Sequence, residues 1–368
     1  MLFNIDKSIS QAVDFIKSGE ARRRMLAGKL SGITGFNLPD LDSRQFLEER
    51  LFFDVEKACL NSRIAGIDSG LADINLHSID FVLIRAMAAL FEFNEGKLAN
   101  AAYLPSFYEF PEPFISADAL DRDEFQSMKS LLRLKQEISL AIKSLMDFKP
   151  EFLFLDGSIV PQYLDKPRLE SAVSGLYKEV ISLYEKLYAL AEEKNCYLVG
   201  AVEDSRGSRF INLLQQELFK NIKGINSSDF NNVSDSGLLD LCLNKGMRTM
   251  VFSYSSNPSE HAILKEFSQD FAERISCFYL KPSSFDRPLR LEFIRPKKDF
   301  SKTVNEIAGC TFALSSLHRE YAFPSILIEA DLRARLKQEE IKIVSDKIMD
   351  RIGIERGALR LRRNSRPF

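Results

Sequence analysis

Two stretches of the sequence share one design and decide the fold: RIAGIDSG at residues 63–70 and EFLFLDGS at residues 151–158. Each is a short apolar run that ends in an aspartate, Asp68 in the first and Asp156 in the second, followed by Ser and Gly. Such a run predicts a strand, and Asp before small residues is typical of the turn that ends it. For either aspartate alone, a role in the turn is the simpler interpretation.

The sequence around these two runs predicts an α/β protein with a mixed sheet flanked by helices. The apolar runs at 79–91 and 99–104 follow the first strand with no helix between them, which predicts an antiparallel meander. The run at 151–156 is apolar throughout, which favours a central, parallel strand covered on both faces. Further strands are expected at 196–202, 248–254, 276–281 and 288–294, and helices at 7–30, 43–61, 121–147, 168–194, 207–221, 301–317 and 324–350.

The two aspartates form a candidate metal site if their strands are parallel neighbours. Both carboxylates then lie at the same end of the sheet, where ligand crevices of open α/β sheets are found. Two carboxylates in one crevice repel each other unless a cation holds them, and Mg²⁺ or Mn²⁺ prefers such oxygen ligands. Glu137, on the helix before the second strand, is a possible third acid, although a helical Glu is most often a solvated surface residue. Three carboxylates around a metal suit phosphodiester hydrolysis.

The order of these motifs resembles that of the NurA family of nucleases. The strand with Asp68, the helix with Glu137 and the strand with Asp156 are followed by a late aromatic–proline motif, YAFPSILIE, at residues 321–329. The resemblance covers residues from about 60 to 340. It implies an RNase H-like core, a ring-shaped homodimer, and Mn²⁺-dependent cutting and resection of DNA alongside a hexameric HerA ATPase in double-strand-break repair. It also implies that Asp68, Glu137 and Asp156 are metal ligands and that Tyr321 is an accessory catalytic residue.

Two positions depart from the family pattern. Eight residues after the Tyr, where the family commonly has a metal-binding His, this sequence has Glu329. Glu329 is a possible Mn²⁺ or Mg²⁺ ligand, and a surface Glu on a helix is the alternative. A basic residue expected near Glu203 is absent, and Arg206 and Arg209 are candidates for DNA phosphate contacts in its place. A solvated, helix-capping loop is the alternative for that segment.

Composition excludes several classes of protein. Charge is balanced, with 50 basic and 52 acidic residues, so any DNA site must be local. The apolar runs are too short to span a bilayer, and five cysteines without metal-ligand spacing are typical of a reducing cytoplasm. The three scattered His argue against a His-based zinc site, and no Walker A motif is present. We therefore expect a cytoplasmic protein with a helical extension at residues 1–62, a nuclease domain at 63–350 and a basic tail at 351–368.

Two other functions remain open from the sequence. The GIDSG motif is also similar to the first phosphate loop of actin-like kinases and chaperone ATPases, but the second Gly-rich Asp loop of those proteins is missing. A non-catalytic scaffold that holds DNA or an ATPase would explain Glu329 and Glu203. The clustering of three acids argues against the scaffold, because a site without catalysis has no need of them.

Overall fold

The computed structural model describes residues 5–33, 45–75, 80–106, 110–111, 113–116, 120–168, 170–222 and 225–352. The predicted basic tail at 351–368 lies almost wholly outside these residues. The chain forms two compact units. Unit 1 comprises Met1–Ala58, Ala201–Ser256 and Arg274–Phe323, and unit 2 comprises Cys59–Gly200, Asn257–Glu273 and Pro324–Phe368. Among the described helices, none is both long enough and apolar enough to cross a membrane.

A mixed sheet forms the centre of unit 2. Its strands are β2 (Arg63–Asn75), β3 (Asp80–Asn94), β4 (Lys97–Leu104), β5 (Pro113–Ser116), β6 (Phe152–Asp156) and β7 (Tyr197–Val202). β2, β3 and β4 are successive antiparallel neighbours, and β5 pairs with β3. β6 pairs with β2 in parallel, and β7 lies beside β6. The antiparallel meander and the parallel strand that the sequence predicted are therefore both confirmed.

One expectation about β2 is wrong. The sequence predicted that this strand ends at Asp68 in an Asp-Ser-Gly turn, but β2 continues for seven more residues and pairs with β3 along its whole length. Extended pairing satisfies the backbone polar groups of Ser69 and Gly70, so no turn is needed there. Asp68 thus lies within a strand, whereas Asp156 ends one.

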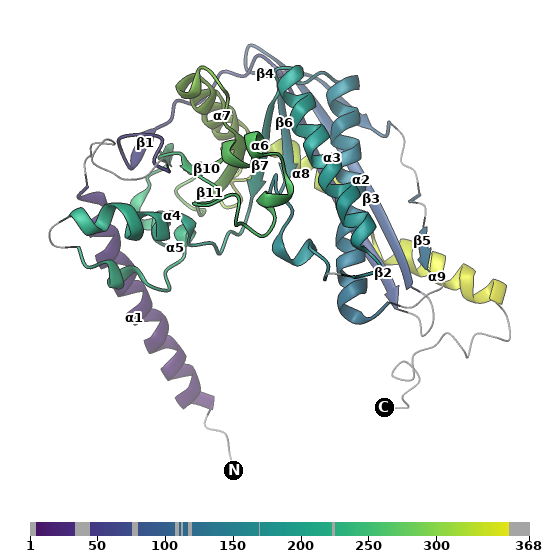
Figure 1. Cartoon of the computed structure of the whole chain (residues 1–368), viewed down its shortest axis with the longest axis horizontal. Helices are drawn as coiled ribbons and strands as arrows, with labels where there is room; N and C mark the ends of the chain where they lie inside the picture. The colour runs from purple at the N-terminus through teal and green to yellow at the C-terminus, as the bar shows by residue number, and fades with distance from the viewer. Residues whose placement is uncertain are drawn as a thin grey trace. The chain divides into compact units, whose positions relative to one another are not determined.

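Helices cover both faces of the unit 2 sheet. α2 (Arg122–Asp147) and α3 (Ser174–Glu193) lie side by side, as Figure 1 shows. α8 (Ser325–Ala334) packs on β2 at Gly66 and Gly70, while Ser69 bonds to α2. Because successive strand residues point to opposite faces, α8 and α2 cover opposite sides of β2. Asp68 lies two residues from both Gly66 and Gly70, so it points to the same face of β2 as these glycines, which is the face that α8 covers.

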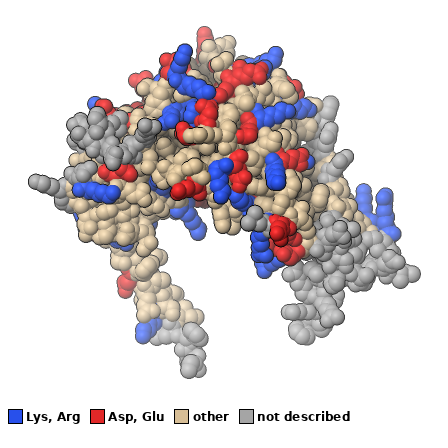
Figure 2. All heavy atoms as spheres, in the orientation of Figure 1, with Lys and Arg blue, Asp and Glu red and all other residues tan. Residues whose placement is uncertain are grey.

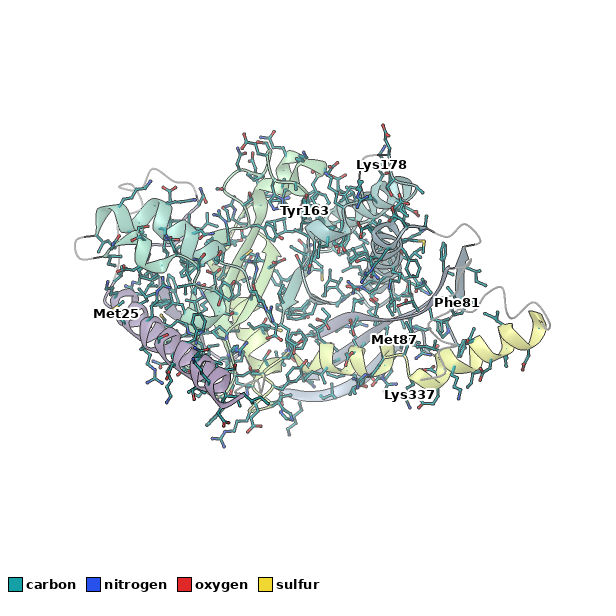
Figure 3. The ribbon with its side chains drawn as sticks, turned by 90° about the horizontal axis from the view of Figure 1, so that it is seen from below. Met25, Phe81, Met87, Tyr163, Lys178 and Lys337 are labelled. Carbon is teal, nitrogen blue, oxygen red and sulfur yellow. The ribbon has the colours of Figure 1, made fainter. Side chains whose placement is uncertain are left out.

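The last predicted helix, 324–350, is two helices in the structure. α8 ends at Ala334, and α9 (Gln338–Ile352) begins after a short break that includes Lys337, labelled in Figure 3. Buried Arg85 of β3 holds the break, donating to the Arg335 carbonyl and to Glu340. α9 packs against a small core that includes Phe81, so the bend serves to bring a second apolar helix face onto the sheet.

Unit 1 is built on antiparallel strands and a separate apolar core. Its strands are β1 (Phe52–Asp54), β8 (Met247–Thr249), β9 (Phe252–Ser253), β10 (Ile275–Lys281) and β11 (Leu289–Ile294). Its main helices are α1 (Ile5–Ser31), α4 (Arg209–Leu213), α5 (Asp235–Cys242) and α7 (Phe300–Ser315). β10 pairs with β8, β9 and β11, and β1 pairs with β8. The buried ends of α1, α4 and α5 pack into one cluster with β9 and β10.

Two helix predictions in unit 1 are corrected. Residues 43–61, read as a helix from the spacing of Leu47, Leu51 and Val55, hold β1 and no helix among the described positions from 45 onward. Pairing with β8 gives this segment its partners, and tertiary contacts override the local pattern. The helix predicted at 207–221 is α4 followed by a π turn and a 3-10 turn.

Candidate functional site

Asp68 and Asp156 are brought together by the register of β2 and β6. The last pair in this parallel ladder is Ile67 with Leu155. Asp68 and Asp156 are the next residues along these two adjacent strands. Neighbouring strands lie about 4.8 Å apart, and residues at one level point to the same face. Because β6 ends here while β2 continues, the aspartates lie at a step in the sheet. The parallel arrangement inferred from the sequence is confirmed.

The turn after Asp156 requires glycine at two places. Gly157 has a φ of +100°, a conformation that residues with a side chain rarely adopt. The Gly157 carbonyl approaches Gly200 of β7 so closely that a Cβ at Gly200 would lie 2.7 Å from the Gly157 oxygen. These two glycines let the chain turn sharply against β7, which fixes the position of Asp156.

Glu137 of α2 reaches the same step from the other face of the sheet. Its side chain is only 3% exposed, and its Oε2 accepts a 2.7 Å hydrogen bond from the Ser69 hydroxyl. Arg133, one helical turn earlier, donates to the same oxygen at 3.0 Å. Since Ser69 is adjacent to Asp68, this hydrogen bond holds α2 against the part of β2 that carries Asp68.

The environment of the site raises the pKa of both buried acids, Asp68 and Glu137. Burial, opposed by Arg133 and the Ser69 hydrogen bond, raises the pKa of Glu137 to about 7. Burial and the nearby charge of Asp331 raise the pKa of Asp68 above its usual range. Burial alone would lower the pKa of Arg133, but Glu137 and the other acids raise it overall. One arginine therefore faces an excess of carboxylates.

The acid that α8 brings to the site is Asp331 rather than Glu329. Asp331 acts on the charge of Asp68, whereas Glu329 accepts hydrogen bonds from the Tyr103 hydroxyl of β4 at 2.9 Å and from Arg333 at 2.8 Å. β4 is separated from β2 by β3, so Glu329 lies over a different part of the sheet. The structure thus does not bring Glu329 to the carboxylates, whereas Asp331, two residues later, lies near enough to Asp68 for its charge to raise the pKa of Asp68.

A cavity of about 700 Å³ opens at the step in the sheet. Its wall includes Glu137, Arg133 and Asp156, and it continues along α2 and the turn after β6. The remaining lining residues are Asp123, Gln126, Ser127, Ser130, Leu134, Gly157, Ser158, Val160, Pro161, Gln162, Leu164, Asp165 and Tyr184. This hollow gives solvent and a ligand access to Asp156 and Glu137, whereas Asp68 is not among its lining residues.

The donor set fits a hard divalent cation. The acids Asp68, Asp156, Glu137 and Asp331 outnumber the single nearby arginine, and carboxylate oxygens are the ligands that Mg²⁺ and Mn²⁺ prefer. Within the described ranges, no group of three His, Cys, Asp or Glu is already arranged as a metal site. Glu137 is engaged by Ser69 and Arg133 instead, so the two strand aspartates with water are the simplest ligand set.

The other predicted site residues belong to unit 1. Tyr321 is 41% exposed, with its ring centroid 5.8 Å from that of Phe323. Arg209 donates to Gln45 and to the Tyr254 carbonyl, so its guanidinium has partners inside the unit. Arg206 is exposed and has no hydrogen bond or ion pair with any described residue. Only Arg206 of these two arginines is therefore available to an external phosphate.

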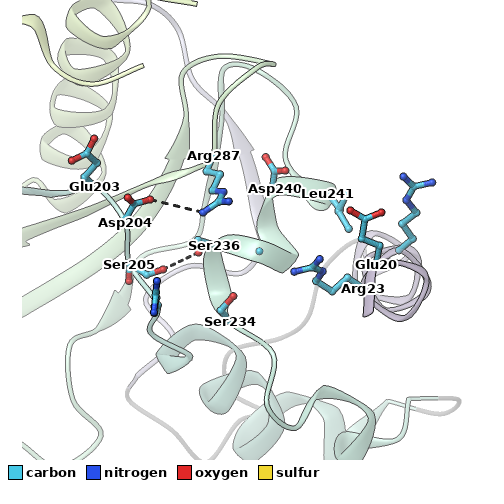
Figure 4. A pocket seen from close by; sticks show the side chains of 13 residues that line it. Glu20, Arg23, Glu203, Asp204, Ser205, Ser234, Ser236, Asp240, Leu241 and Arg287 are labelled. Carbon is cyan, nitrogen blue, oxygen red and sulfur yellow. Dashed lines mark hydrogen bonds and ion pairs between the residues drawn. The ribbon is translucent and has the colours of Figure 1, made fainter. Parts of the chain in front are cut away.

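Arg206 lines a second cavity, of about 570 Å³, drawn in Figure 4. Four arginines and four acids share its wall, namely Arg23, Arg24, Arg206, Arg287, Glu20, Glu203, Asp204 and Asp240. Arg287 lies 3.9 Å from Asp204, and Ser236 donates to the Ser205 carbonyl. The wall is balanced in charge, unlike the carboxylate cavity of unit 2.

Sequence reasoning missed three residues of the carboxylate site. Arg133 could have been found from its i, i+4 spacing to Glu137, and Asp331 from its i, i+4 spacing to buried Leu327. Asp165, which accepts hydrogen bonds from Ser130 and from the backbone of Gln162, gave no signal, because its role depends on a turn.

Comparisons with known proteins bear on this site. A family model described as the NurA domain matches residues 62–336. The NurA nuclease structure from Sulfolobus solfataricus is 16% identical, covers 96% of this chain and 99% of its own, and has a TM-score of 0.58. A second NurA structure is 10% identical, covers 94% and 97%, and has a TM-score of 0.52. A comparison with curated proteins found no match.

Proposed function

Because this chain belongs to the NurA family, we propose that it is a nuclease that cuts DNA phosphodiester bonds with the help of Mn²⁺ or Mg²⁺. The observation that carries the proposal is the β2–β6 register, which sets Asp68 beside Asp156, while Asp156 and Glu137 line an open cavity. Carboxylates gathered at one end of a sheet suit metal-assisted hydrolysis of a phosphodiester.

Asp68 and Asp156 would hold the cation, with Asp331 as a further donor in the place expected for Glu329. The carboxylate of Asp68 is buried, that of Asp156 is half-buried and that of Asp331 is exposed, and a cation would relieve the repulsion between them. When bound, it supplies Lewis-acid activation of water and of the phosphodiester.

Glu137 either adds a third ligand or positions the attacking water, and its contacts favour the second role. Oε2 accepts the hydrogen bonds of Ser69 and Arg133, which leaves Oε1 to take a proton from that water. A pKa of about 7 suits a group that accepts and releases a proton near neutral pH. Arg133, at the cavity wall, would contact the phosphate oxygens.

Arg206 and Tyr321 are proposed accessory residues. The exposed guanidinium of Arg206 offers a contact for the DNA backbone. The phenol of Tyr321 can donate a hydrogen bond to a phosphate oxygen or a water. Arg209 would act indirectly, by holding the start of α4 through Gln45 and Tyr254.

Family membership alone supports the remaining parts of the proposal. These are a homodimer, a hexameric HerA-type ATPase as partner, and resection of DNA ends in double-strand-break repair in the cytoplasm. Light scattering of the pure chain tests the dimer, and co-purification with the ATPase tests the partner.

The decisive experiment is cleavage of end-labelled single- and double-stranded DNA with EDTA, Mg²⁺ or Mn²⁺. We expect metal-dependent cutting that falls at least a hundredfold in Asp68→Asn and in Asp156→Asn. Asp147→Asn, at the exposed end of α2, is the matched control and should cut like the wild type. Normal cutting by Asp68→Asn would refute the site.

The non-catalytic scaffold is the other outcome of the same experiment. If the wild type binds DNA but cuts under none of these metals, the chain is a binding protein with a NurA fold. The displaced Glu329 at the end of the late motif would then be the first difference to examine, by Glu329→His.

A further inference from the structure

An exposed apolar pair stands at the edge of the carboxylate cavity. Tyr163 is 72% exposed and Leu164 80% exposed, and both lie in the 3-10 turn η2 (Tyr163–Asp165) that follows β6. Leu164 and its neighbours Gln162 and Asp165 line the cavity, and Figure 3 labels Tyr163. Two adjacent large side chains exposed at the rim of a cavity offer an apolar surface to a ligand.

The turn is firmly anchored from beneath. Asp165 is buried and accepts hydrogen bonds from the Gln162 backbone at 2.7 Å and from Ser130 of α2 at 2.5 Å. Lys166 donates to the Ala262 carbonyl at 2.9 Å and pairs with Glu266. The residues next to the pair are thus held by hydrogen bonds within the unit, while the side chains of Tyr163 and Leu164 are exposed to solvent.

We propose that Tyr163 and Leu164 form a stacking site for an unpaired nucleobase next to the phosphate that is cut. This proposal rests on the proposed function and names the part of the DNA that the site selects. Leu164 lines the same cavity as Asp156 and Glu137, so a DNA strand whose phosphate reaches these acids lies close to the turn that carries the pair.

The chemistry of the pair selects single strands. Every base has a π face that stacks on an aromatic ring, and such stacking is worth about 1–3 kcal/mol per base. In a duplex those faces are covered by neighbouring base pairs, whereas a frayed or single-stranded end exposes them. The pair therefore favours substrates with unpaired bases beside the scissile bond and shows little preference for sequence.

The test measures binding in EDTA, where no cleavage is needed. A single-stranded oligonucleotide carries the fluorescent base 2-aminopurine at successive positions. We expect the wild type to quench the probe at one position, and Tyr163→Ala to abolish this quenching and weaken binding about 5- to 150-fold. Tyr163→Phe, which keeps the ring, should retain both. Phe110→Ala, which removes another exposed aromatic of the same unit, is the matched control.

A second substrate separates stacking from a merely structural role. On an oligonucleotide that lacks the base at the quenched position, wild type and Tyr163→Ala should bind equally. An equal loss on both oligonucleotides would overturn the proposal. So would a Tyr163→Ala variant that binds normally but loses self-association in light scattering, because a second copy would then cover the pair.

The two proposals fail in different ways. Tyr163-dependent quenching without cleavage under any metal would refute the nuclease and leave the stacking site standing. Metal-dependent cleavage that Tyr163→Ala leaves unchanged on single strands would refute the stacking site alone.

Discussion

The carboxylates of the site differ in what holds them. Asp156 is placed by a glycine turn, Asp68 by a continuous strand, and Glu137 by a serine and an arginine. Burial raises the pKa of Glu137 and that of Asp68, so both retain protons more readily than a surface acid. A cation bound by Asp68 displaces the proton of that carboxyl, and its charge also favours the ionised form of nearby Glu137, so metal binding is coupled to pH.

Metal affinity should therefore increase with pH up to neutrality. With a pKa of about 7, Glu137 is mostly protonated at pH 6 and mostly ionised at pH 8. Displacing one proton weakens binding by up to about tenfold per pH unit below this pKa. Calorimetric titration with Mn²⁺ at pH 6, 7 and 8 measures this, and Glu137→Gln should flatten the dependence. Equal wild-type affinity at all three pH values would contradict the assignment.

Substitutions of the two acids of α8, Asp331 and Glu329, should have different effects on cleavage and on stability. Asp331 acts on Asp68, so Asp331→Asn is expected to lower cleavage about tenfold or more and to weaken metal binding. Glu329 bonds to Tyr103 and Arg333, so Glu329→Gln should keep cleavage within twofold and cost about 1 kcal/mol of stability. Steady-state cleavage and urea unfolding measure the two effects. The reverse pattern would place Glu329 in the site.

At the scale of elements, α8 depends on the glycines of β2. A Cβ on Gly70 would lie 2.3 Å from the Ala334 carbonyl, and one on Gly66 would lie 2.9 Å from Ile326. These contacts are with backbone as well as side chain, so the helix itself would have to move. The small residues around Asp68 thus set the distance between β2 and the helix that carries Asp331.

Gly70→Ala should therefore destabilise the protein and lower its activity. Overpacking of this kind typically costs about 1–3 kcal/mol, and a shifted α8 changes the position of Asp331. Gly28→Ala on α1 is the control, because nothing lies within 4 Å of its Cβ position. That change should stabilise the helix by about 0.5–1 kcal/mol. Urea unfolding of both variants checks the prediction, and an unchanged midpoint for Gly70→Ala would contradict it.

A buried acid in unit 1 ties α4 and α5 to β10. Asp235 accepts hydrogen bonds from the backbone of Phe210 and Ile211 and from the Tyr279 hydroxyl. Burial raises the pKa of Asp235 to about 6 from an ordinary value of 3.8. The folded state therefore binds this proton more tightly than the unfolded state does.

The sign of the resulting pH dependence follows from this difference. The Asp235 contribution is fully present below pH 3.8 and is lost as pH rises through 6, by roughly 3 kcal/mol in total. Asp235→Asn carries no such proton, so the stability of the wild type relative to this variant should fall between pH 4 and pH 7. Denaturant unfolding at those two values measures it. A constant difference would show that Asp235 has an ordinary pKa.

At the scale of the whole molecule, net charge provides no general attraction for the DNA of the proposed function. The chain carries a formal charge of −2, and acidic and basic side chains lie interspersed on the face drawn in Figure 2. Phosphate contacts must therefore come from individual arginines rather than from a general positive field. Electrostatic attraction at long range should be weak.

Removal of one arginine that contacts a phosphate should reduce the salt dependence of DNA binding by the amount that one phosphate contact contributes. For single-stranded DNA, Arg206→Ala is expected to reduce the slope of log K against log salt by about 0.7. Lys178→Ala removes the same charge from the exposed face of α3 and should leave the slope unchanged. Anisotropy titrations between low and moderate salt provide the slopes. Equal slopes for wild type and Arg206→Ala would exclude Arg206 from the DNA contact.

The sequence by itself determined the meander, the parallel strand that carries Asp156, and the long helices α2 and α3. These elements have strong local periodicity, and the sequence also predicted that Asp68 and Asp156 lie together if their strands are parallel neighbours, a condition that the structure meets. It also singled out Glu137, through its place on the helix between the two strands.

Only the tertiary structure decided which acid of α8 faces Asp68, where β2 ends, and that residues 52–54 form a strand. A helix repeats every 3.6 residues, so its rotation against a sheet depends on packing partners such as Gly66 and Gly70. A strand end or a short edge strand depends on whether a neighbour supplies hydrogen bonds. These choices are made by contacts between residues far apart in the chain, which local patterns do not record.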